Sequence, residues 1–284
     1  VFLSALNIFL AITGSLGNVL ILNVLPKTSL HSQTKLLFGN LAVTDLCVGL
    51  ISQPLFVTIR LSAVIKMDLE IQYYLMNIAN AFDFILCGVS ILTLSAISVD
   101  RLLALFLGIR YRAIVNLRHT RALLSCFWLS GISGVLLSLF TSFSTQKTAK
   151  IIITICLTLC LIISLFSYTK IVLKLRQHQS SVRDNVQQRR TNAGGIPLNL
   201  DRYKRIVVSI ALVQQALVIC YFPFLIFHIV THLKDIHPGH YLLWYFHTST
   251  LIFLNSSLNP FLYCWRIKEI RQAVKATITG LCAC

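Results

Sequence analysis

Three carboxylates stand inside long apolar stretches of this sequence, and they are the first candidates for chemistry. They are Asp45, Asp83 and Asp100. A carboxylate held away from water is unfavourable unless it meets a counter-ion, hydrogen-bond donors or a hydrated cavity. Each of the three therefore marks a place where we expect an ion, a ligand or a functional partner.

The spacing of Asp83, Ser90 and Arg101 places them on one face of a single helix. Arg101 follows Asp83 by 18 residues, which is five whole turns and about 27 Å of α-helix. Ser90 lies nearly two turns from Asp83, where it could meet Asp45 and Asn259. These groups offer carboxylate, hydroxyl and amide oxygens, the ligands that a small cation prefers. They could instead form a hydrated network that only joins helices.

The composition shows which kind of element must position these groups. The chain has 284 residues, of which 56% are hydrophobic and 12% charged, with a mean hydropathy of +0.77. Soluble domains are about 45–50% apolar and about 25% charged. This excludes an ordinary soluble globule and a disordered chain. The cysteines lie in apolar runs or at the chain end, without Cys-x-x-Cys spacing, so neither a disulfide framework nor a zinc site is expected.

Seven segments are long and apolar enough to cross the roughly 30 Å hydrocarbon core of a bilayer. They cover approximately residues 1–25, 36–61, 72–106, 121–143, 150–175, 203–232 and 241–265. Residues 267–279 then alternate apolar side chains with Lys268, Arg271 and Lys275, which predicts an amphipathic helix in the membrane interface. We predict an all-α membrane protein, a seven-transmembrane helix bundle plus a short amphipathic eighth helix, forming one domain over residues 1–284.

The net charge of +16 is concentrated on one side of these spans. Twenty lysines and arginines lie in or beside the loops after spans one, three, five and seven, against five on the other side. By the positive-inside rule the amino terminus is extracellular and the carboxyl terminus cytoplasmic. The cations border membrane spans and belong to no separate folded domain, so we expect contacts with membrane lipids and none with nucleic acid.

Two connections and the start of the chain complete the expected layout. Residues 144–149 predict a short outer loop, and residues 178–199, rich in Gln, Arg, Asn, Gly and Ser, predict a flexible cytoplasmic loop. Val1 already lies in a hydrophobic run, so we expect a trimmed amino terminus rather than a signal peptide.

Short motifs surround the polar residues of the spans. They are Gly17-Asn18-Val19, Asn40-Leu41-Ala42-Val43-Thr44-Asp45, Asp100-Arg101-Leu102, Trp128, Cys220-Tyr221-Phe222-Pro223 and Asn259-Pro260-Phe261-Leu262-Tyr263. In this order they resemble the signature set of rhodopsin-like (class A) G-protein-coupled receptors, from the first span through the amphipathic helix. The resemblance implies a plasma-membrane receptor that binds an extracellular ligand and activates a heterotrimeric G protein.

The resemblance also implies roles for individual residues. It implies an allosteric sodium site, with no other cofactor, formed by Asp45, Ser90, Asn255 and Asn259. It implies an activation switch formed by Asp100, Arg101, Tyr168, Tyr221, Pro223, Pro260 and Tyr263. The prolines and tyrosines of this set also have interpretations that do not depend on the resemblance. Prolines inside spans predict helix kinks, and tyrosines near span ends could simply anchor the helices at the membrane interface.

Two signals disagree about the ligand. Asp83 occupies the site where aminergic receptors hold the carboxylate that pairs with a ligand ammonium. Met76 replaces the cysteine of the usual outer disulfide, and Cys160 replaces the customary proline of span five, which resembles the melanocortin, cannabinoid and lysophospholipid receptors. We predict a small amine, with a melanocortin-like peptide, a lipid or a nucleoside as the alternative. The predicted ligand-binding residues are Asp83, Cys87, Phe224, His228, Tyr245 and Phe253.

Other interpretations of the same residues remain open at this level. His228 could neutralise Asp83 internally. A cation transporter or channel could use Asp45, Asp83 and Asn259 as a path, although seven spans do not divide into symmetric halves. An intramembrane enzyme would need a nucleophile with a base or a metal set, and we expect no enzymatic activity. Cys282 and Cys284 could be palmitoylated or remain unmodified.

Overall fold

The computed structural model describes residues 2–107, 111, 115–140, 143–189, 200–233 and 238–282, and this part of the chain is almost entirely helical, with no β-strand. In chain order the helices are α1 (Phe2–Val24), the short helix η1 (Leu25–Lys27), α2 (Ser32–Cys47), the π-helical turn η2 (Val48–Ser52), α3 (Gln53–Val64), α4 (Leu69–Leu107), α6 (Leu117–Phe140), α7 (Phe143–Arg189), α8 (Leu200–Leu233), α9 (Pro238–Arg266) and α10 (Lys268–Cys282). The predicted all-helical architecture is confirmed.

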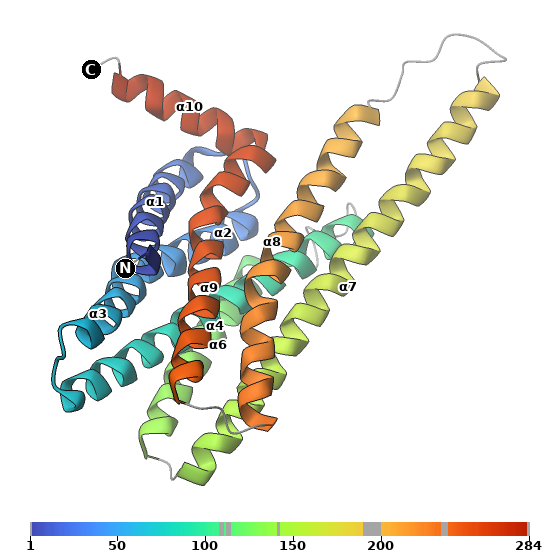
Figure 1. Ribbon diagram of the computed structural model, residues 1–284. Helices are drawn as coiled ribbons and strands as arrows, with labels where there is room; N and C mark the ends of the chain where they lie inside the picture. Colours follow the sequence, from blue (N-terminus) through green and yellow to red (C-terminus); the bar gives the residue numbers. More distant parts are fainter. Residues whose placement is uncertain are drawn as a thin grey trace.

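Helix α4 is the central element of the bundle. It packs against α2, α6 and α7, while α1 packs against α2 and α9, and α8 packs against α7 and α9. Helix α10 follows α9 almost directly and runs across one end of the bundle, and α7 and α8 project beyond the bundle toward that same end (Figure 1). The 39 residues of α4 extend over roughly 58 Å, so this helix links the two ends.

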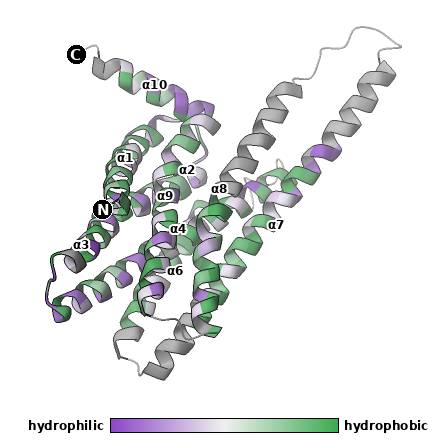
Figure 2. Cartoon of the chain, viewed as in Figure 1, coloured by the Kyte–Doolittle hydropathy of each residue, from purple (hydrophilic) through white to green (hydrophobic). Residues whose placement is uncertain are grey.

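The lengths and compositions of the helices suit a bilayer. Among the described residues, five segments meet the length and hydropathy expected of a membrane span: Phe2–Lys27, Ser32–Ser62, Leu69–Leu107, Leu117–Leu137 and Thr154–Lys174. Helix α8 contains the shorter apolar stretch Ala216–Thr231. Polar residues such as Asn255 and Asn259 lower the mean hydropathy of α9. Figure 2 shows hydrophobic residues along most of the described helices and a hydrophilic segment where α9 meets α10.

The helix of the second predicted span contains a π-helical turn, which its apolar composition did not indicate. The turn η2 separates α2 from α3, and Pro54 stands at the start of α3. Proline has no backbone N–H and cannot continue the regular ladder of helical hydrogen bonds. A π-helical turn contains an extra residue and changes which faces of the following helix meet the bundle. Beyond this turn Phe56 faces the interior, where its side chain is 1% exposed.

Glycines allow α1 to approach its neighbours closely. A Cβ atom on Gly17 would lie 2.9 Å from ring carbons of Pro260, and one on Gly14 would lie 2.9 Å from Oγ of Ser257. Small residues at such contacts let membrane helices pack backbone to backbone. The side chain of Asn18, fully buried one residue after Gly17, donates to the backbone oxygen of Ser256 at 3.3 Å. The first motif of the sequence therefore joins α1 to α9.

Two loop predictions are corrected by the extent of α7. This helix begins at Phe143 and ends at Arg189, so residues 144–149, expected to form an outer loop, are helical. Residues 178–189 of the expected cytoplasmic loop are also helical. Neither stretch contains Gly or Pro, so no strong helix breaker interrupts α7 there. Residues 190–199, which contain Gly194, Gly195 and Pro197, lie outside the described part.

Candidate ligand and switch sites in the helix bundle

A polar cluster occupies the middle of the bundle. Asp45 of α2 is 1% exposed, and its Oδ2 accepts a hydrogen bond from Nδ2 of Asn259 in α9 at 2.7 Å. Its Oδ1 accepts a longer hydrogen bond from Oγ of Ser90 in α4 at 3.5 Å. Three elements distant in sequence thus converge on one carboxylate. Three of the four residues assigned to the sodium site come together as expected.

The fourth residue, Asn255, lies one turn before Asn259 on α9 and is buried. Its Nδ2 atom has no hydrogen-bond partner among the described residues. The cluster has one carboxylate together with hydroxyl and amide groups, and the described residues contain no group of three or more His, Cys, Asp or Glu side chains suited to a metal. Such a donor set fits a single-charged cation better than a divalent one.

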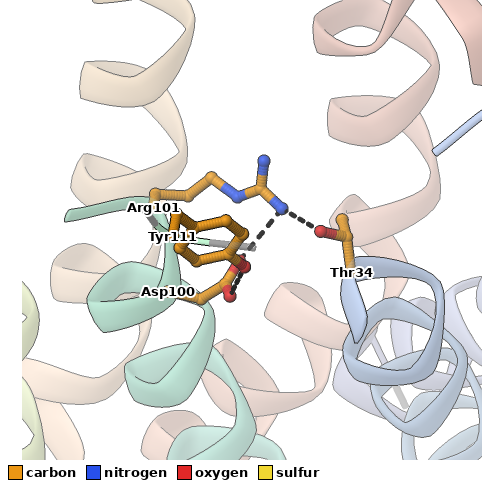
Figure 3. A network of polar contacts seen from close by, with 4 residues as sticks. All are labelled: Thr34, Asp100, Arg101 and Tyr111. Atoms are coloured by element: carbon orange, nitrogen blue, oxygen red, sulfur yellow. Dashed lines mark hydrogen bonds and ion pairs between the residues drawn. The ribbon is translucent and has the colours of Figure 1, made fainter. Parts of the chain in front are cut away.

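A second network lies where α4 approaches its carboxyl-terminal end (Figure 3). Oδ2 of Asp100 forms an ion pair with Nη2 of Arg101 at 3.0 Å, and the same Nη2 donates a hydrogen bond to Oγ1 of Thr34 in α2. The hydroxyl of Tyr111 donates to Oδ1 of Asp100. Asp100 is therefore held from two sides, and Arg101 bridges α4 to α2.

Tyr111 was not singled out from the sequence. Its side chain is 8% exposed, and its ring meets that of His31 edge to face, with centroids 6.2 Å apart. Burial, together with the hydrogen bond and negative charge of Asp100, raises the pKa of Tyr111 well above its usual range. The hydroxyl therefore keeps its proton and remains a donor to Asp100 at neutral pH. Its position ten residues after Arg101 gives no local signal of this contact.

A third polar group surrounds Asp83 in the amino-terminal half of α4. The hydroxyl of Tyr245 in α9 lies 3.5 Å from Oδ2 of Asp83 and 2.9 Å from Oδ1 of Asn80. The side chain of Ser52 in η2 lies near the same carboxylate and can act on it as a hydrogen-bond donor. The inaccessible Oδ1 of Asp83 has no hydrogen-bond partner among the described residues. The hydrogen-bond donor seen at Oδ2 of Asp83 is therefore the hydroxyl of Tyr245.

Aromatic rings form a wall beside Asp83. The ring of Phe56 meets Phe246 and Phe253 at centroid distances of 4.9 Å and 5.2 Å. The rings of Tyr245 and Tyr241 are stacked, with 5° between their planes and 6.4 Å between centroids. Phe253 and Tyr245 were predicted for this region, whereas Phe56 and Tyr241 were missed. Phe56 was missed because the π-helical turn before it changes the face on which it lies.

The remaining predicted ligand residues lie on α4 and α8. Cys87 is half-buried one turn after Asp83 and packs against both apolar clusters of the core. Phe224 and His228 are neighbours on α8, with ring centroids 4.4 Å apart. Asn80 could have been found from sequence, because it precedes Asp83 by three residues and so shares its helix face.

The remaining switch residues are spread over three helices. Tyr221 is buried in α8, and the ring of Tyr263 in α9 meets Phe38 with centroids 4.8 Å apart. Tyr168 is half-buried in α7. Pro223 and Pro260 lie inside α8 and α9, which continue as helices through both. Cys282 ends α10, and Cys284 lies outside the described residues.

Comparison with known proteins agrees with this arrangement. The family described as "7 transmembrane receptor (rhodopsin family)" matches residues 17–263. The chain is 25% identical to melanocortin receptor 4 of Danio rerio, over 97% of this chain and 82% of that protein. It is 25% identical to melanocortin receptor 5 of Mus musculus, covering 96% and 84% of the two chains, and 27% identical to melanocortin receptor 3 of Rattus norvegicus, covering 96% and 85%.

The chain belongs to the rhodopsin family of seven-transmembrane receptors, because the family match covers most of its length. The predicted seven-helix membrane bundle and the predicted receptor class are thereby confirmed. The protein is a G-protein-coupled receptor, and its family consists of multi-pass plasma-membrane receptors rather than enzymes.

Proposed function

We propose that this receptor is activated by an extracellular ligand that places a cationic group against Asp83, most simply a small amine, and that it then activates a heterotrimeric G protein. The observation that carries the proposal is the unpartnered Oδ1 of Asp83. An unsatisfied carboxylate oxygen in an apolar surrounding favours a positively charged partner. From the distribution of positive charge we also propose an extracellular amino terminus and a cytoplasmic carboxyl terminus.

The groups around Asp83 support a cation in two ways. The Tyr245 hydroxyl also contacts Asn80, at 2.9 Å, so it supplies at most one hydrogen bond shared between two acceptors. The ring of Tyr245 stands close by, since its hydroxyl lies 3.5 Å from Oδ2 of Asp83, and aromatic faces attract cations. A ligand ammonium would therefore gain both an ion pair and a cation–π contact.

A melanocortin-like peptide is the second candidate, and a specific observation favours it. The relatives described above are named melanocortin receptors, and they align with almost the whole chain. A peptide with a cationic side chain would use Asp83 as an amine would. The two candidates therefore share the same chemical requirement at this carboxylate.

The experiment is a screen of small amines and short cationic peptides on Asp83→Asn and the unmodified receptor, with nucleotide exchange on an added heterotrimeric G protein as the readout. Removing one member of a desolvated charge pair costs about 2–5 kcal/mol, or roughly 30-fold to several thousand-fold in affinity. We expect the variant to lose the response to any cationic agonist while surface expression is retained.

The matched control is Asp68→Asn. Asp68 is an exposed acid ahead of α4, and its Oδ1 accepts a hydrogen bond from the backbone of Glu70. This control removes the same charge without touching the bundle and should respond normally. A normal response of Asp83→Asn to the active cation would refute the proposed contact.

We further propose that Asp45, Ser90 and Asn259, with Asn255 beside them, hold an allosteric sodium ion. The buried single carboxylate and its oxygen-bearing neighbours support this site. Sodium bound there should lower agonist affinity, and by reciprocity agonist should weaken sodium to the same extent. Agonist binding is measured in sodium chloride and in choline chloride at equal ionic strength, with Asp45→Asn as the variant. Full sodium sensitivity in Asp45→Asn would reject the assignment.

A further inference from the structure

Arg60 is a cation near the carboxyl-terminal end of α3, and it has no anionic partner among the described residues. Its guanidinium carbon lies 4.6 Å from the centroid of the Phe246 ring. Among the described residues, Arg60 forms neither an ion pair nor a side-chain hydrogen bond, whereas Arg101 is paired with Asp100. The guanidinium thus carries five N–H donors over an aromatic face, with its edge available to an acceptor.

Arg60 and Asp83 border the same aromatic wall. Phe246 beneath Arg60 contacts Tyr245, with centroids 5.7 Å apart, and the Tyr245 hydroxyl reaches Asp83. Phe56 touches both rings. The wall therefore has an unpaired cation at one margin and a carboxylate with an unpaired oxygen at the other.

The distance between these charges is set by α3. Four-residue steps separate Ser52, Phe56 and Arg60, so these three residues share one helix face. Ser52 lies near Asp83. Eight residues of helix rise about 12 Å. An extended peptide spans about 3.3–3.6 Å per residue, so three residues cover roughly the same length.

The neighbouring acids of the outer segment do not satisfy Arg60. Asp68 and Glu70 are both exposed, and neither forms an ion pair within the described part of the chain. Asp68 instead accepts a backbone hydrogen bond at the start of α4.

We infer that Arg60 is the subsite for an anionic group of the ligand, and that the ligand is a zwitterion about the length of a tripeptide, with its cation on Asp83 and its carboxylate on Arg60. This inference rests on the proposed function for the Asp83 half of the contact. A planar guanidinium matches a carboxylate through two parallel hydrogen bonds. A central aromatic side chain of such a ligand would meet Tyr241, which stacks on Tyr245 and is the exposed ring of the wall.

The test uses a panel of tripeptides with a central Phe, each made in four forms. The amino terminus is free or acetylated, and the carboxyl terminus is a free acid or an amide. Nucleotide exchange on added G protein is measured for the unmodified receptor, Arg60→Gln, Arg60→Lys and the control Lys66→Gln. Lys66 is an exposed cation beyond the end of α3, so its variant removes the same charge from the same region.

On the unmodified receptor the free acid should be about 10-fold to 100-fold more potent than its amide, the usual effect of a charged hydrogen bond. Arg60→Gln should abolish this preference, Arg60→Lys should retain part of it, and Lys66→Gln should leave it unchanged. Equal potency of acid and amide, a preserved preference in Arg60→Gln, an equal loss in Lys66→Gln, or no response to any free acid of the panel would overturn the inference.

The two proposals fail separately in this design. Asp83→Asn tests the cation contact through the free and acetylated amino termini, whereas Arg60→Gln tests the anion contact through the acid and the amide. Sensitivity to acetylation that persists in Asp83→Asn counts against the proposed function. A preference for the acid that depends on Arg60 supports the anion subsite in either case.

Discussion

At the residue scale, carboxylates of this receptor are held by partners that the linear sequence does not place beside them. Tyr245, eight residues before Phe253 on α9, supplies the hydroxyl that approaches Asp83. Tyr245 and Phe253 were both predicted as ligand-binding residues from the sequence. Two helical turns separate the two positions, and they share a face within about 80°. The hydroxyl that approaches Asp83 therefore comes from a residue about two turns before Phe253 on α9.

The contact of Tyr111 with Asp100 predicts a change in basal signalling. Tyr111→Phe keeps the ring against His31 but removes the hydrogen bond that restrains Asp100, the partner of Arg101. A net hydrogen bond contributes about 0.5–1.5 kcal/mol, so basal nucleotide exchange should rise about 2-fold to 10-fold. Agonist-free exchange is measured at matched surface expression. The exposed Tyr73→Phe serves as the control, and unchanged basal exchange in Tyr111→Phe would show that this contact does not restrain the switch.

At the element scale, the bundle depends on how closely α1 approaches α9. Gly17 faces the ring of Pro260, whose carbons would lie 2.9 Å from an added Cβ atom. A proline ring cannot rotate aside as a flexible side chain would, so either the helices separate or the proline moves. The first and last motifs of the chain are therefore in contact, and α1 braces the part of α9 that contains Asn259.

We expect Gly17→Ala to destabilise the folded receptor. Overpacking of a close contact costs about 1–3 kcal/mol, and alanine's better helix propensity offsets only about 1 kcal/mol of it. The melting temperature of detergent-solubilised receptor should fall. Gly88→Ala on α4 is the matched control, because an added Cβ there meets nothing within 4 Å, and its melting temperature should stay equal or rise. Similar melting temperatures for the two variants would mean that α1 adjusts freely.

At the scale of the whole molecule, the described residues lack the outer disulfide common in the family. Met76 stands at the position expected for its first cysteine. The described cysteines Cys47, Cys87, Cys126, Cys156, Cys160, Cys220 and Cys264 are all free and lie within helices. Helix packing and the membrane must therefore hold the described part together.

Mild reduction should leave this receptor functional. Agonist binding and the melting temperature are compared with and without dithiothreitol, and both should agree within error because no disulfide joins the described cysteines. A receptor with an engineered disulfide between α4 and the start of α7 provides a positive control for reduction. Loss of binding by the unmodified chain under dithiothreitol would reveal a cysteine pairing that the present arrangement does not contain.

The sequence by itself determined the helical class, the receptor family and the positions of Asp45, Asp83 and Arg101 along their spans. It could do so because lipid imposes a local rule: a span needs about 20 apolar residues, and its backbone must satisfy its own hydrogen bonds. Any polar residue in such a span then stands out. The close contacts of Asp45 with Ser90 and Asn259 also followed from spacing and resemblance.

Only the tertiary structure decided which side chains meet between helices. Three such contacts depend on helix rotation and on the extra residue in η2. They are the approach of Tyr245 to Asp83, the cation–π contact of Arg60 with Phe246 and the hydrogen bond of Tyr111 to Asp100. The continuation of α7 to Arg189 likewise overrode a polar composition. A helix of a soluble protein shows its buried face by the periodicity of its apolar residues. In lipid both faces of a helix are apolar, so only packing between helices fixes its rotation.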